Sequence, residues 1–110
     1  MDVFLHEIVR TLAILPRDAY EVGDLGEVPA ELRRIIAVAK DIGQSCCCWR
    51  DEKHHHYLFL AEMSPQLSKR RGATVLHVDE YDERGLRGSS SWIQEHAGKW
   101  RRCDEPPGGG

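Results

Sequence analysis

The periodicity of the chain changes in residues 43–63, which read GQSCCCWRDEKHHHYLFLAEM, and this change decides the fold. Residues 46–50 and 54–63 are rich in residue types that suit β-strands, and the short polar segment 51–53 lies between them. Gly43 is a typical residue for ending the helical pattern that precedes it. The stretch therefore predicts a β-hairpin that directly follows a helical region.

Two amphipathic helices are predicted before this point. Apolar side chains in residues 2–15 recur every three or four positions, and Pro16 disfavours helical backbone at the residue before it. A second helical pattern begins near Pro29, which suits the first position of a helix, and Ile36 is expected on its buried stripe. Residues 16–28 contain one proline and two glycines, so they are predicted to form an irregular connection.

Further strands are predicted after the first hairpin. Residues 73–81 alternate between apolar and polar side chains, as a half-buried strand does. Residues 91–95 and 99–103 flank Ala97 and Gly98, where a glycine with positive φ suits a hairpin loop. Residues 64–72 are expected to form a basic loop or a single helical turn, and residues 82–90 a polar loop with two glycines. Residues 104–110 are expected to be a disordered tail.

This order of elements predicts an α+β protein. Helices come first and strands follow, so the two kinds of element are segregated along the chain. We expect the two N-terminal helices to pack on one face of a four- to five-stranded antiparallel meander sheet. Residues 1–103 are expected to form a single domain, followed by the Pro/Gly-rich tail at 104–110.

Length, charge and composition narrow the functional class. The chain has 110 residues with 15 basic and 18 acidic side chains, and a net charge of -3 weighs against a general nucleic-acid binder. Its longest aliphatic–aromatic run, residues 57–61, is far shorter than the ~20 residues of a spanning helix. No basic segment typical of a secretion signal precedes the first apolar residues. We therefore expect a cytoplasmic protein without a membrane partner, whose cysteines are free thiols.

A cluster of cysteines and histidines flanks the first predicted hairpin loop. Thiolate and imidazole are the ligands that zinc prefers, and the weak candidates for a zinc site are Cys46, Cys48, His54 and His56. With a two-residue loop at 51–52, each face of the hairpin collects only two or three of the four ligands that a tetrahedral site needs. Cysteines that pack as small apolar residues are the favoured interpretation, so no metal and no other cofactor is predicted.

The residue types of a hydrolase triad occur near the third strand. His77, Asp79 and Glu80 precede three consecutive serines at positions 89–91. The segment 88–92 reads GSSSW, which lacks the strand–elbow–helix context in which a nucleophilic serine is held. No catalytic residue is therefore predicted.

Basic and aromatic side chains in two segments predict a binding surface. Tryptophan and arginine are enriched in the hot spots of protein interfaces. Two tryptophans in one hairpin are too apolar for both to be exposed, so Trp92 is expected in the core and Trp100 toward the surface. The predicted partner-binding residues are Lys69, Arg70, Arg71, Trp100, Arg101 and Arg102.

These observations favour a small, non-catalytic protein-binding domain of the inhibitor, immunity, phage-accessory or assembly-subunit type. It would act through the C-terminal hairpin and the basic loop. The first alternative is a nucleic-acid-associated subunit, in which the basic loop contacts phosphates and the tryptophans stack on bases. The second alternative is a domain stabilised by zinc in the Cys/His hairpin.

Overall fold

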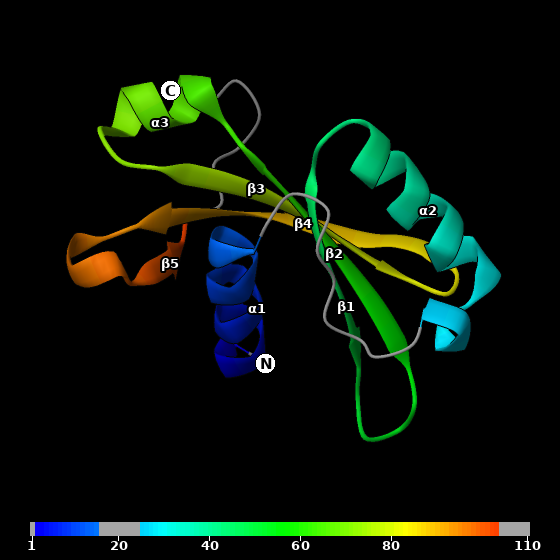
Figure 1. The fold of residues 1–110 in the computed structure, drawn as a ribbon. Coiled ribbons are helices and arrows are strands. Elements are labelled where there is room, and N and C mark those ends of the chain that lie inside the picture. The colour runs from blue at the N-terminus through cyan, green and yellow to red at the C-terminus, as the bar shows by residue number, and fades with distance from the viewer. Residues whose placement is uncertain (1, 16–24, 104–110) are drawn as a thin grey trace.

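Two α-helices precede the first strand, as the sequence predicts, and a third α-helix lies between two strands. The computed structural model describes residues 2–15 and 25–103, which form three α-helices, two short 3-10 helices and one five-stranded sheet (Figure 1). The α-helices are α1 (Asp2–Ile14), α2 (Ala30–Asp41) and α3 (Pro65–Arg71), and the 3-10 helices are η1 (Leu25–Glu27) and η2 (His96–Gly98). The strands are β1 (Ser45–Arg50), β2 (His56–Met63), β3 (Val75–Asp82), β4 (Gly85–Gln94) and β5 (Trp100–Arg102).

The helices end where local chemistry requires. Gly43, with φ +79°, follows α2 and accepts the left-handed backbone that closes a helix. Ser64 caps α3, because its Oγ accepts a hydrogen bond from the Leu67 amide at 3.3 Å. Gly72 ends α3 in the left-handed conformation at φ +71°. The segment predicted as a loop or a single turn is therefore a capped helix of seven residues.

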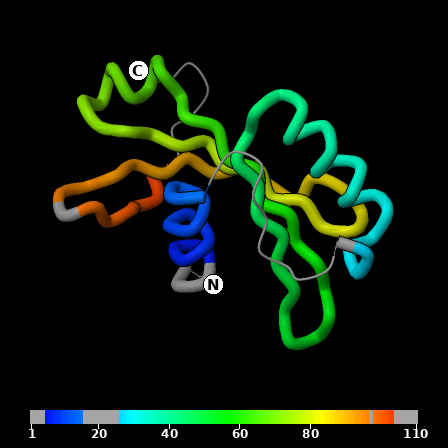
Figure 2. The backbone as a smooth tube through the Cα atoms, viewed as in Figure 1, coloured from blue at the N-terminus to red at the C-terminus, as the bar shows by residue number. Residues whose placement is uncertain are grey.

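The five strands form an antiparallel meander. Their order in the sheet is β1-β2-β3-β4-β5, so each strand pairs with its neighbour in the sequence, and every pairing is antiparallel. The chain traced in Figure 2 shows the same succession, with α3 inserted between β2 and β3. The α+β class with two N-terminal helices and an antiparallel sheet is thereby confirmed.

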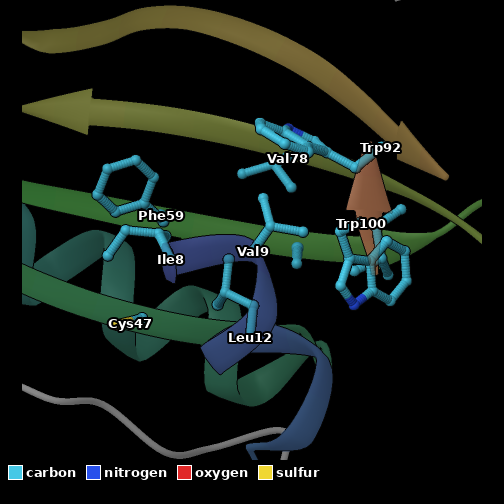
Figure 3. Close-up of a cluster of buried hydrophobic side chains, with 10 residues drawn as sticks. Ile8, Val9, Leu12, Cys47, Phe59, Val78, Trp92 and Trp100 are labelled. Atoms are coloured by element: carbon cyan, nitrogen blue, oxygen red, sulfur yellow. The ribbon is translucent and has the colours of Figure 1, made fainter. Parts of the chain in front are cut away.

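The two N-terminal helices cover opposite faces of the sheet rather than sharing one. Successive strand residues point to opposite faces, and β1 and β2 are apolar on both. Cys47 and Phe59 pack with α1 residues such as Ile8 (Figure 3). Cys46, Cys48, Leu58 and Leu60 pack on the other face with α2 residues, namely Leu32, Ile36 and Ala39. The protein thus has a core on each side of the β1–β2 hairpin, and the predicted burial of Ile36 is confirmed at 2% exposure.

One predicted loop is a strand. Residues 82–90, expected as a polar loop, instead form the last residue of β3, the β3–β4 turn and the first part of β4. Gly85 has φ +129°, which a glycine adopts at no steric cost beside the tight turn. The ladder continues with a bulge beside Glu80 and Tyr81. Backbone hydrogen bonding to β3 therefore makes a strand of residues whose side chains suggested a loop.

Two predicted segments lie outside the described residues. These are the tail at 104–110 and most of the irregular connection, at 16–24. Within the parts that the structure describes, no helix has the length and apolar character needed to cross a lipid bilayer.

Candidate functional site

Trp100 lies in the core, which corrects its assignment to the binding surface. The pairing of Gln94 with Trp100 places Trp100 on the same face as Trp92, which faces α1. Trp92 and Trp100 are 4% and 5% exposed, and both belong to the cluster that contains Val9 and Leu12 (Figure 3). The inward position of Trp92 is confirmed. The expected surface position of Trp100 is wrong, because the register depends on the length of the hairpin loop, which the sequence does not fix.

The remaining predicted binding residues are exposed and lie at one end of the sheet. Three of them occupy the last turn of α3, and Arg101 and Arg102 lie on β5 beside Lys99. We call this group the basic end, and it consists of Lys69, Arg70, Arg71, Lys99, Arg101 and Arg102.

The fold, and not the sequence, brings these two segments together. Val75, which follows α3, pairs with Ile93 of β4, and Ile93 pairs with Arg101 of β5. Adjacent strands are ~4.8 Å apart, so about 10 Å separates the backbones of Val75 and Arg101. The Ser68 hydroxyl accepts a hydrogen bond from the Val75 amide at 2.8 Å and ties α3 to the start of β3. Six cations therefore lie at one end of the sheet, with Arg101 and Arg102 on opposite faces of β5.

The two segments that carry these cations contain one acidic side chain, and Glu80 of β3 lines a hollow with Arg102. In residues 64–74 and 95–103 the only carboxylate is Glu95, and its Oε1 lies 2.8 Å from Nε of Arg101. Both partners are about half exposed, and such surface ion pairs contribute at most ~1 kcal/mol. Lys69 and Lys99 have no ion-pair partner in the described part of the chain. Arg70, Arg71 and Arg102 each make further contacts, so the unpaired positive charge of the basic end lies on Lys69 and Lys99.

The Cys/His hairpin has a register that separates the weak zinc candidates. Cys48 pairs with Leu58 and Cys46 with Leu60, while Arg50 pairs with His56. His54 lies in the loop with φ +64°. The pairing considered for a two-residue loop does not occur, because five residues lie between the two strands. Across the described residues, no three side chains of His, Cys, Asp or Glu are grouped so that they could hold a metal.

The thiols of this hairpin are buried. Cys46 and Cys48 are at most 1% exposed and pack with the α2 core, whereas Cys103 is half-buried. Burial, and secondarily the nearby Cys46, raises the pKa of Cys48 to about 12. This thiol is therefore neutral at physiological pH, and it acts as a small apolar side chain rather than as a ligand or nucleophile.

Asp51 closes the five-residue loop and explains why the expected register fails. Its Oδ1 accepts hydrogen bonds from the amides of Lys53 and His55, both at 2.9 Å. Its Oδ2 accepts one from the Tyr57 hydroxyl at 3.1 Å. The His55 amide is the main reason why the pKa of Asp51 lies below its ordinary value. One carboxylate thus organises the wider loop.

The triad-like residue types meet on the exposed face of β3 and β4, but in an unproductive order. Nε2 of His77 lies 3.0 Å from Oδ1 of Asp79, and the Ser89 hydroxyl donates to that same oxygen at 2.6 Å. The carboxylate therefore sits between the serine and the histidine. Because the Ser89 proton is donated to Asp79, the imidazole is not the base that would activate this hydroxyl.

An aromatic pair that the sequence pattern did not indicate lies at the opposite end of the sheet. Trp49 and Tyr57 are paired across β1 and β2, and both are half-buried. The guanidinium of Arg87 lies 4.9 Å from the centre of the Tyr57 ring. We call the adjoining concavity the aromatic hollow; it has a volume of about 580 Å³ and is lined by Trp49, Arg50, Asp51, Glu52, Lys53, His55 and Tyr57. Only the correct hairpin register would have revealed this pair.

Comparison of the chain with protein-family models, with curated proteins and with solved structures found no match.

Proposed function

We propose that the protein is a non-catalytic binding module whose basic end recognises an acidic surface of a partner protein. The observation that carries the proposal is that α3 and β5 place six cations at one end of the sheet, two of which, Lys69 and Lys99, are in no ion pair among the described residues. Charged patches of this kind steer a complementary partner and reject partners of like charge. Recognition of an acidic surface is the chemistry that these cations support best.

A protein partner is favoured over nucleic acid. Binding to single strands combines cations with aromatic rings on which bases stack. Trp92 and Trp100 are buried, so neither tryptophan of the C-terminal hairpin presents a ring to a base. The net charge of -3 adds a long-range repulsion of phosphate chains. The basic end therefore fits a limited acidic patch better than a continuous polyanion.

The proposal is tested by a charge reversal that spares all recorded contacts. Lys69→Glu with Lys99→Glu inverts two cations that have no ion-pair partner in the described residues. The immobilised protein is used to capture partners from its host with and without nuclease treatment, and bound proteins are quantified by mass spectrometry. We expect a nuclease-resistant partner that the variant retains roughly tenfold less well, because reversing charges at an interface creates like-charge repulsion.

A matched control separates a local effect from a change in net charge. Arg10→Glu with Arg33→Glu makes the same change in charge on exposed positions of α1 and α2. The control should capture the partner as the wild type does. Thermal unfolding of both variants checks the fold. This check is needed because an acidic residue in the last turn of α3 lowers the free energy of unfolding by ~0.3–1 kcal/mol. Equal capture by the two variants, or capture abolished by nuclease, would overturn the proposal.

A further inference from the structure

We propose that the aromatic hollow binds an uncharged oligosaccharide, and that it does so independently of the basic end. The hollow lies at the loop end of the β1–β2 hairpin, away from α3 and β5 (Figure 1). Its volume of about 580 Å³ falls within the ~300–1,000 Å³ of ligand sites in proteins. A smaller hollow of about 230 Å³ shares His55 and Tyr57 with it, so the two together suit a ligand of two linked rings.

The formal charges that line the aromatic hollow cancel, which favours a ligand without net charge. Arg50 and Lys53 carry two positive charges, and Asp51 and Glu52 carry two negative charges. The smaller hollow is balanced in the same way, with two arginines against two carboxylates. A charged ligand would therefore meet as many like charges as opposite ones. An uncharged ligand that is rich in polar groups avoids this repulsion and still forms hydrogen bonds with both kinds of side chain.

Two neighbouring side chains of the hairpin loop are open to such a ligand. Glu52 and Lys53 line the hollow, and neither side chain has an ion pair or a hydrogen bond among the residues that the structure describes. An ionised glutamate only accepts hydrogen bonds, and a lysine only donates them. A carboxylate ligand would pair with Lys53 alone, and an ammonium group with Glu52 alone. A hydroxyl group both donates and accepts, so neighbouring hydroxyls of a sugar satisfy both side chains.

Aromatic side chains supply the apolar part of the site. Trp49 and Tyr57 are paired across β1 and β2, and both are half-buried at the margin of the α1 core. The face of an aromatic ring is electrostatically negative, so it attracts the weakly positive C–H groups on the flat side of a sugar ring. A sugar therefore uses both features of the hollow, because its C–H groups contact the rings while its hydroxyls bind the loop. A purely apolar ligand would leave Glu52 and Lys53 without partners.

Internal hydrogen bonds hold the site in one shape. Both carboxylate oxygens of Asp51 accept hydrogen bonds, one from two loop amides and the other from the Tyr57 hydroxyl. The His56 amide donates to Glu83 and ties the hairpin to the neighbouring β3–β4 turn. Because these groups are ordered before binding, a ligand loses less of its binding energy to ordering them.

The test uses three neutral disaccharides and the indole signal of Trp49. Cellobiose, maltose and lactose are each titrated into the ¹⁵N-labelled full chain and followed by NMR. The indole signals of Trp92 and Trp100 are internal references, because both side chains are buried. We expect at least one disaccharide to give a saturable shift of the Trp49 indole, with a Kd on the order of 1 mM. Raising the ionic strength to ~1 M should leave this Kd unchanged, because salt screens attraction between net charges and the ligand has none.

A pair of matched variants and two charged peptides serve as controls. Glu52→Ala with Lys53→Ala preserves the net charge and should weaken binding roughly tenfold, because the hydroxyls lose an acceptor and a donor. Glu7→Ala with Arg10→Ala removes the same charges from exposed positions of α1 and should bind as the wild type does. Capped peptides of glutamate or of lysine around a central phenylalanine should give no saturable Trp49 shift, because the charges of the hollow cancel.

Three results would overturn the inference. The first is correctly folded protein in which none of the three disaccharides gives a saturable Trp49 shift. The second is disaccharide binding that Glu52→Ala with Lys53→Ala does not weaken. The third is a charged peptide that binds the hollow more tightly than every disaccharide. Lys69→Glu with Lys99→Glu should bind the disaccharides as the wild type does, so the outcome does not depend on whether the basic end binds a partner.

Discussion

Truncating Trp100 to alanine is expected to lower the free energy of unfolding by about 3–5 kcal/mol. The side chain is 5% exposed, and an indole buries ~150–250 Å². At ~25 cal/mol per Å², complete removal from water is worth about 4–6 kcal/mol. Alanine retains the Cβ, and α1 can relax partly into the space, so the lower range applies. The free energy of unfolding of a small domain is only about 5–15 kcal/mol, so a loss of this size should be easy to measure.

Urea unfolding monitored by far-ultraviolet circular dichroism measures this loss without relying on tryptophan fluorescence. The matched comparison is Trp49→Ala, which truncates a half-buried tryptophan at the margin of the same cluster and should cost less. A loss below about 0.5 kcal/mol for Trp100→Ala, with an unchanged dependence on urea, would refute the placement of Trp100 in the core. It would also restore this residue as a candidate for the binding surface.

Three further results are expected. Ile36→Ala should cost about 2–5 kcal/mol in chemical denaturation, because Ile36 is 2% exposed in the α2 core; a loss near zero would contradict that burial. In native protein at about pH 8 a thiol reagent should modify Cys103 but not Cys48, whose pKa burial raises to about 12, and rapid labelling of Cys48 without unfolding would contradict its burial. The His56 amide holds the pKa of Glu83 below its ordinary 4.5, so ionised Glu83 stabilises the fold above that pH, and this contribution is lost as the pH falls through the lowered pKa. Glu83→Gln should therefore flatten the decline of the free energy of unfolding between about pH 5 and 3. An unchanged decline would argue against the hydrogen bond between the His56 amide and Glu83.

The α+β class followed from local patterns, because helical and strand periodicities occupy separate parts of the chain. The faces that the helices cover did not. Cys46, Cys47 and Cys48 point alternately to the two faces of the sheet. A pattern of polar and apolar residues cannot show this alternation, because all three side chains are apolar. Because β1 and β2 are buried on both faces, a helix covers each face, and α1 and α2 therefore lie on opposite sides of the sheet.

The two hairpin registers set the limit on predicting the site. The Asp51 side chain accepts hydrogen bonds from two amides of the first loop. These bonds hold the loop at five residues, so that Cys48 does not pair with a histidine. Gln94 pairs with Trp100 across the second hairpin, which turns Trp100 inward. A one-residue change in register moves a side chain to the other face, so hydropathy alone could not settle either position.

The cations of the basic end could be identified from sequence, but their convergence could not. Lys69 and Arg101 are separated by two strands and a turn in the chain, and the β3–β4–β5 pairing brings their segments together. The tight turn that permits this pairing lies in residues that read as a polar loop. Serines and glycines have weak strand preference, so ladder hydrogen bonds rather than propensity decided the structure there.

A site-specific photo-cross-linking measurement tests most directly whether the basic end is the surface that meets a partner protein. A photoreactive amino acid is placed at Lys99 in one preparation and at Arg33, on exposed α2, in the other, and each is illuminated in the native host. We expect a nuclease-resistant cross-link to an acidic protein surface from position 99, and no such product from position 33. Cross-links from position 33 alone, or a position-99 product that consists of nucleic acid, would contradict it.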